Sequence, residues 1–130
     1  FASGLGMSNE AHRLHADFDS RLDVEPDTRV EVPDLVKAWE SGDALATAVI
    51  EHASRGIAAL IEMLARFSDP DAVVLGGSVA LSDELFSHVL SLVDPHATRL
   101  MQCGVRRTGL NPATIALLGC AAHALERMHR

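Results

Sequence analysis

DPDAVVLGGSVA, residues 69–80, is the stretch of sequence that decides how this chain folds. After the turn residues 69–71, the four residues Ala72 to Leu75 form a short run that is apolar on both faces. Such a run is typical of a central strand in a parallel sheet that helices cover on both sides. Gly76 and Gly77 follow at once. Glycine adopts positive φ and lets a neighbour approach the backbone without a Cβ in the way.

The two glycines leave two interpretations open. Ligands of open α/β sheets bind outside the carboxyl ends of the strands, which is where Gly76 and Gly77 would lie. A tight turn between a strand and a helix explains the same pair equally well. The stretch contains neither the G-x-G-x-x-G pattern of dinucleotide-binding folds nor the G-K-[ST] end of a phosphate-binding loop, so both of these motifs are excluded.

Around this strand the sequence predicts a helix-rich α/β fold with one parallel strand pair. Capping residues and apolar spacing predict helices over about 3–16, 33–41, 44–67, 83–92 and from 112 onward, and a second strand over about 98–105. The expected N-caps are Ser3, Asp43, Ser82 or Asp83, and Asn111. Residues 17–31 carry six acids and predict a loop. Because two strands do not make a stable sheet, further strands must come from elsewhere in a parent chain or from another molecule.

Two of these helices carry features that call for a neighbour. Gly56 lies inside the long helix, where glycine costs about 1 kcal/mol relative to alanine, and a close helix or strand neighbour would explain it. The last helix has an apolar stripe that includes Leu118 and Leu125, with small residues at 119–122. We expect this stripe to pack tightly on the sheet.

Composition limits the classes of protein that the chain can represent. Its 130 residues, 48% of them hydrophobic, suit one folded domain. The net charge of -7 argues against a nucleic-acid-binding surface on this segment. Cys103 and Cys120 are too few for a disulfide scaffold, and we expect buried, inert thiols in a cytoplasmic protein. No stretch of 18 consecutive apolar residues is present, and the start at Phe1 suggests part of a longer chain.

Other polar and aromatic residues invite a functional interpretation, and for each a structural one is favoured. His12 and His15 lie three residues apart, a spacing that suits a metal, but no third ligand is evident, so we expect a solvated helix face and no metal site. Trp39 suits an interface anchor, although a packing role is more common. Arg106 and Arg107 would reach a phosphate after the second strand, but a charge pair at the sheet edge explains them as well. The remaining histidines are expected at the surface or at helix ends.

Four blocks, in this order, resemble the ROK family of sugar kinases and sugar-responsive repressors: FASG (1–4), SGDALATAVIEHASRGIAALIEML (41–64), DPDAVVLGGSVA (69–80) and GLNPATIALLGCAAHAL (109–125). The resemblance implies an actin-like ATPase (ribonuclease H-like) fold of two α/β lobes. Residues 1–130 would be most of the C-terminal lobe, with an incomplete sheet and covering helices, and the N-terminal lobe would be absent. Gly76, Gly77 and Ser78 would line the adenosine or ribose of ATP, and Ser3 and Gly4 would lie near the cleft. Ser78 stands where the family more usually has a third glycine.

The resemblance also implies an activity. The intact protein would be an ATP-dependent sugar kinase that phosphorylates a hexose or N-acetylhexosamine in the cleft between its lobes. The family's catalytic aspartate, its D-x-G-x-T phosphate segment and its zinc-binding cysteine segment have no counterpart here. We therefore expect no catalytic residue in this chain, ATP with Mg²⁺ and a structural zinc only in the intact protein, and no phosphoryl transfer by these 130 residues alone. The alternatives are the effector-binding and oligomerisation part of a ROK repressor, or a lone lobe that dimerises. Homo-oligomers are expected in every case.

Overall fold

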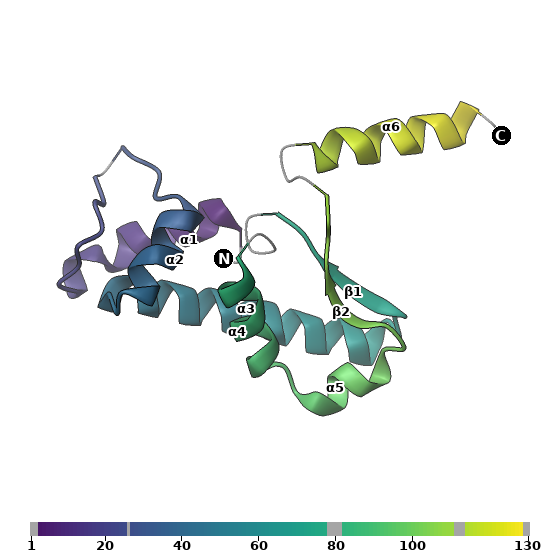
Figure 1. Ribbon diagram of the computed structural model, residues 1–130, viewed down its shortest axis with the longest axis horizontal. Helices are drawn as coiled ribbons and strands as arrows, with labels where there is room; N and C mark the ends of the chain where they lie inside the picture. The colour runs from purple at the N-terminus through teal and green to yellow at the C-terminus, as the bar shows by residue number, and fades with distance from the viewer. Residues whose placement is uncertain (1–2, 26, 78–81, 111–113, 129–130) are drawn as a thin grey trace.

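The computed structural model describes residues 3–25, 27–77, 82–110 and 114–128, and it contains one small parallel sheet and several helices (Figure 1). In chain order the elements are α1 (Gly4–Leu14), the 3₁₀ turn η1 (His15–Asp17), α2 (Val32–Glu40), α3 (Ala44–Phe67), β1 (Ala72–Leu75), α4 (Asp83–Leu92), α5 (Pro95–Leu100), β2 (Gly104–Arg107) and α6 (Ile115–Met128). The expected helix over 44–67 and the strand over 72–75 are confirmed with those bounds.

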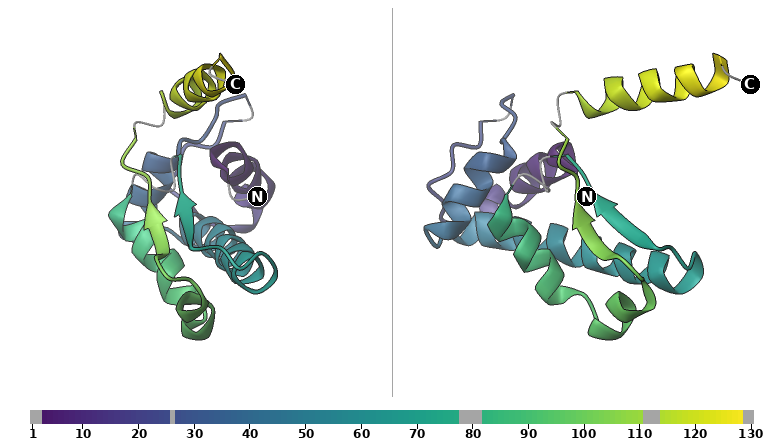
Figure 2. Two further views of the ribbon diagram at one scale, coloured as in Figure 1. Left: turned by 90° about the vertical axis from the view of Figure 1, so that its right-hand side faces the viewer. Right: turned by 45° about the vertical axis from the view of Figure 1, so that its right-hand side comes forward.

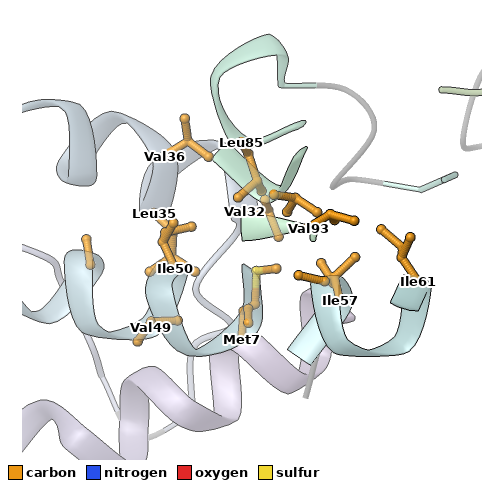
Figure 3. Packing of buried hydrophobic residues seen from close by; sticks show 14 of the residues in the cluster. Met7, Val32, Leu35, Val36, Val49, Ile50, Ile57, Ile61, Leu85 and Val93 are labelled. Carbon is orange, nitrogen blue, oxygen red and sulfur yellow. The ribbon is translucent and has the colours of Figure 1, made fainter. Parts of the chain in front are cut away.

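Helix α3 is the element on which the others pack. It contacts α1, α2, α4, α5 and β1. Met7, Leu35, Ile50 and Leu85 are fully buried, and they bring side chains of α1, α2, α3 and α4 together (Figure 3). Burying an aliphatic side chain of this size contributes about 1.5–3 kcal/mol. By length and composition alone α3 would also be able to cross a membrane, but half of that apolar window is buried inside this structure.

The start of α3 is tied to the loop that precedes α2. The Asp43 carboxylate caps α3 by accepting from the Ala46 amide at 3.0 Å, and it also accepts from the Ser20 hydroxyl and the Arg21 amide, each at 2.9 Å. Burial raises the pKa of Asp43, but these hydrogen bonds outweigh it, so that the pKa lies below its ordinary value. Gly42, with φ of 82°, makes the turn from α2 into this cap. One carboxylate therefore organises both the helix start and the acidic loop.

Replacing Asp43 tests this arrangement. We expect Asp43→Ala to lower the free energy of unfolding by about 1–2 kcal/mol, because it removes a helix cap. Asp43→Asn retains an N-cap side chain and should cost less. Urea unfolding followed by circular dichroism measures both variants. Equal losses of unfolding free energy in the two variants would show that the helix cap at residue 43 does not contribute to stability.

The second strand differs from the sequence prediction. Residues 98–105 were expected to be extended, but α5 runs to Leu100 and β2 begins at Gly104. Asp94 and Pro95 follow the end of α4 at Leu92, and they start α5. The Asp94 side chain accepts from the His96 amide at 2.8 Å, and Pro95 occupies the first turn of α5.

The described residues cover the sheet on one face only. Strand β1 pairs with β2 in parallel, Ala72 opposite Gly104 and Leu75 opposite Arg107. Val73 and Val105 pack against the core, whereas Val74 is 60% exposed. The expectation of a strand covered on both faces is therefore not met by the part of the chain that the structure describes.

The second face of the sheet is left open because α6, which is expected to pack on the sheet, does not do so. It extends away from the rest of the chain (Figure 1), and Leu118 and Leu125 are 50% and 57% exposed instead of packed on the sheet. The prediction of buried thiols is wrong, because Cys103, just before β2, and Cys120, on α6, are both exposed. The expected cap Asn111 lies outside the described residues.

Candidate functional site

The turn after β1 has the geometry that the glycine pair predicts. Gly77 has φ of 74°, a region that side-chain-bearing residues rarely adopt, and Gly76 is exposed. Among the described residues, apart from the chain neighbours of Gly77, no heavy atom lies within 4 Å of the position that a Cβ on Gly77 would occupy. The described residues therefore leave space beside the backbone of half-buried Gly77. Ser78, the third residue of the predicted site, lies outside the described residues.

The register of the sheet sets what lies beside this turn. Because the strands are parallel, their carboxyl ends meet at one edge of the sheet. Leu75 pairs with Arg107, and the Thr108 amide donates to the Leu75 carbonyl at 2.8 Å. The residues that follow β2 are thus immediate neighbours of Gly76.

The arginines at this edge are engaged with the protein. Arg107 forms an ion pair with Asp83 and lies over the Phe86 ring, 5.3 Å from its centroid. Arg106 donates from Nε to the Cys103 carbonyl at 3.0 Å. The interpretation of a charge pair at the sheet edge is confirmed for Arg107, and its effect is to fasten the first turn of α4 to the end of β2.

The start of α4 is unsuited to a phosphate group. Ser82 caps the helix by accepting from the Leu85 amide at 3.0 Å, and Asp83 and Glu84 fill the first turn. The positive end of a helix dipole lies at the N-terminus and attracts anions, but carboxylates in the first turn offset that positive potential. An anionic group placed against this end of α4 would meet two carboxylates.

Sequence comparison identifies the family. A family model described as ROK matches residues 1–116, which include both strands and the glycine turn. The chain belongs to the ROK family. No curated protein matches it.

A solved structure supports the fold of this ROK chain. It is described as a ROK family transcriptional regulator, a homolog of the E. coli MLC protein, and its TM-score is 0.56 at 18% sequence identity. The likeness covers 81% of this chain and 27% of that one. At this identity it shows a shared α/β fold, and this ROK chain spans less than a third of the length of the structure that it matches.

The other predicted site residues lie at the start of α1. Ser3 is the N-cap of α1, and its hydroxyl accepts from the Gly6 amide at 3.1 Å, while Gly4 is the first helical residue. Helix α1 and strand β1 are each held against α3. A structural role explains Ser3 fully, and a role of Ser3 and Gly4 near a nucleotide stays a prediction.

A buried carboxylate on α1 was not singled out by the sequence. Glu10 is only 6% exposed, and Arg13 binds it with two hydrogen bonds of 2.7 and 2.9 Å. The Nδ1 atom of His52, on α3, lies 2.8 Å from the same carboxylate. The Arg13 guanidinium outweighs the effect of burial and, together with His52, lowers the pKa of Glu10 from 4.5 to about 2.

His88 corrects another prediction, because it was expected at the surface or at a helix end and instead lies half-buried within α4. Its side chain is 19% exposed, and its ring lies 5.1 Å from that of Trp39, between α4 and α2. Its Nε2 atom is 3.0 Å from Glu51 Oε1, but the alignment is not that of a hydrogen bond. Trp39 packs against the core, as the more common of its two interpretations predicts.

The two histidines with metal-like spacing lie on different elements, His12 on α1 and His15 in η1. His12 is half-buried and His15 is exposed. Within the described ranges no three histidine, cysteine or acidic side chains converge. The sequence could have indicated the Glu10–Arg13 pair from its i, i+3 spacing, but His52 joins it from 42 residues away.

Acid titration tests the Glu10 cluster. A carboxylate whose pKa is lowered on folding stabilises the protein above its ordinary pKa and loses that contribution as the pH falls toward the folded value. We therefore expect Glu10→Gln to reduce stability at neutral pH and to flatten the loss of stability between pH 4.5 and about 2. Urea unfolding across this range measures the effect, with the exposed Glu25→Gln as the control. Parallel acid curves for the wild type and Glu10→Gln would contradict the assignment.

Proposed function

We propose that this chain is most of the C-terminal, nucleotide-binding lobe of an ATP-dependent sugar kinase of the ROK family. The lobe would have the actin-like ATPase fold, and the intact protein would phosphorylate a hexose or N-acetylhexosamine in the cytoplasm. Membership of the family supports this proposal. So does the small parallel sheet with its covering helices, which resembles a ROK structure of more than three times the matched length.

The observation that carries the proposal is the open Gly77 backbone at the carboxyl end of a parallel strand pair. Gly76, Gly77 and Ser78 would receive the adenosine or ribose of ATP, because a Cβ at residue 77 would fill the space that the nucleoside needs. The acidic first turn of α4 favours an uncharged group at this point and directs the triphosphate elsewhere.

The groups that perform the chemistry would lie outside this chain. Phosphoryl transfer requires a positioned nucleophile, Mg²⁺ and groups that hold the phosphates. Mg²⁺ would neutralise charge on the phosphates, and no described residue of this chain is assigned to it. The part played by this lobe would be to orient the nucleoside and to exclude water when the lobes close. The 130-residue chain alone is therefore expected to show no ATP-dependent sugar phosphorylation.

A ROK repressor is the second candidate, and the similarity to a solved ROK transcriptional regulator favours it. In that case the same lobe would support effector binding and oligomerisation, and a separate segment would bind DNA. Ser78, in place of a third glycine, also suits a site that has lost its nucleotide. The two candidates differ in whether the intact protein binds ATP.

ATP binding by the full-length protein separates the candidates. We expect binding that Gly77→Val weakens at least about tenfold, equivalent to ~1.4 kcal/mol, because valine strains the turn and fills the approach. Gly42→Val is the matched control, since Gly42 also has positive φ with open space around it but lies in the turn between α2 and α3. Isothermal titration calorimetry measures both variants. Full-length protein that binds a sugar but no ATP would overturn the kinase proposal in favour of the repressor.

A further inference from the structure

We propose that His88 and Glu51 form a proton-operated link between α4 and α3, which tightens when His88 takes up a proton as the pH falls. The link acts on the helix that follows the glycine turn, and therefore on one side of the candidate site. The inference does not depend on whether the intact protein binds ATP.

The imidazole of His88 lies between α4, α3 and α2. Helix α4 packs against α3 (Figure 2), and the His88 ring is 5.1 Å from the ring of Trp39 on α2. The Nε2 atom of His88 is buried and has no hydrogen-bond partner among the described residues. A buried polar atom without a partner is rare and costly in native proteins. This atom therefore calls for an interaction that the neutral ring does not make.

The Glu51 carboxylate is placed to supply that interaction. Its Oε1 atom is 3.0 Å from His88 Nε2. Arg55 donates from Nε and Nη2 to the other oxygen, Oε2, at 3.3 Å each, so Oε1 is left facing the imidazole. The Arg55 side chain is 73% exposed and that of His88 only 19%, so water screens the charge of Arg55 more strongly.

Protonation changes the nature of this contact. A neutral imidazole has one N–H donor, whereas the protonated ring has a donor on each nitrogen. In the protonated ring, Nε2 is a charged donor at hydrogen-bond distance from Glu51, and a small rotation of the ring would align the two groups. Charge-assisted hydrogen bonds are roughly twice as strong as neutral ones. Because histidine changes charge between about pH 5 and 8, we expect α4 to be held more tightly at the acid end of this range.

The other charged group of α4 near the ring already has a partner. Glu84 lies one turn before His88, and its carboxylate accepts from the Ser82 hydroxyl at 3.1 Å. This hydrogen bond holds the Glu84 carboxylate at the cap of α4, away from the contact between α4 and α3.

The side of the ring that faces α2 adds no competing acceptor. Trp39 presents an uncharged ring, and aromatic faces attract cations. Of the charged residues beside Trp39 on α2, Lys37 is 4.0 Å from Asp34 and Glu40 is exposed. Glu51 on α3 is therefore the group that determines how the His88 contact responds to a proton.

The position of α4 gives the link its reach. Ser82 caps α4 in the segment that follows Gly77. The ion pair between Asp83 and Arg107 fastens the first turn of α4 to the end of β2. A tighter hold of α3 on α4 therefore steadies the edge of the sheet at which the glycine turn lies.

Amide hydrogen exchange in α4 of the full-length protein tests the link. His88→Gln leaves a polar side chain that takes up no proton, and Glu51→Gln keeps the imidazole but removes the carboxylate. At about pH 5.5 we expect α4 in both variants to exchange at least about fivefold faster than in the wild type. At about pH 8 we expect a difference of less than about twofold. Comparing the proteins at the same pH removes the pH dependence of the chemical exchange rate.

His96→Gln is the matched control, because it removes another imidazole at an exposed position on α5. We expect it to leave exchange in α4 unchanged at both pH values. Equal effects of His88→Gln at the two pH values would show a packing role alone and would overturn the proposal. An effect of His88→Gln that Glu51→Gln does not share would also overturn it, because the carboxylate would then not be the partner.

An NMR titration of the His88 imidazole gives an independent measurement that requires no change in stability. We expect Glu51→Gln to lower the affinity of His88 for a proton at least about threefold, because it removes the anion beside Nε2. The His96 imidazole in the same sample is the internal control. An unchanged His88 titration would overturn the proposal. Absence of ATP binding together with the expected change in the His88 titration would reject the kinase and keep this inference.

Discussion

The burial of α3 is the constraint on which the rest of the structure depends. A helix of 24 residues has more apolar surface than one neighbour can cover, and α1, α2, α4, α5 and β1 each take part of it. The loop before α2 is fixed to the same helix through Asp43. This packing also fixes the position of the glycine turn, because β1 follows α3 after a short turn and packs against α3.

Two kinds of interaction fix the positions of the helices around α3. Aliphatic contacts dominate the interior, and a few polar groups link helices that are distant in the sequence. Glu10 and His52 join α1 to α3, while Glu62 accepts from the Asp94 amide at 2.8 Å and joins α3 to the start of α5. These links are local in space, and they orient the helices more than they add to the hydrophobic stabilisation.

The sequence predicts those parts of the fold that depend on neighbours within a few residues. Ser3, Asp43 and Ser82 are caps whose partners lie three residues away, so their helices begin where expected. The strand expected over 98–105 is wrong in its first part because Asp94 and Pro95, which follow one helix, also start the short helix α5. The exposure of Cys103 and Cys120 was not accessible to sequence reasoning, because it depends on which elements pack over them in three dimensions. Within the candidate site, the open backbone at Gly77 follows from the glycine itself, whereas the Arg107–Asp83 pair requires the register of the sheet.

The contact between Trp39 and His88 has a consequence for observing this protein in solution. Trp39 is the only tryptophan, and its ring lies 5.1 Å from the imidazole of His88, at the junction of α2 and α4. Its fluorescence therefore originates at one known place, where α2 packs against α4. Trp39 fluorescence therefore reports how α4 packs against α2, and no added dye is needed.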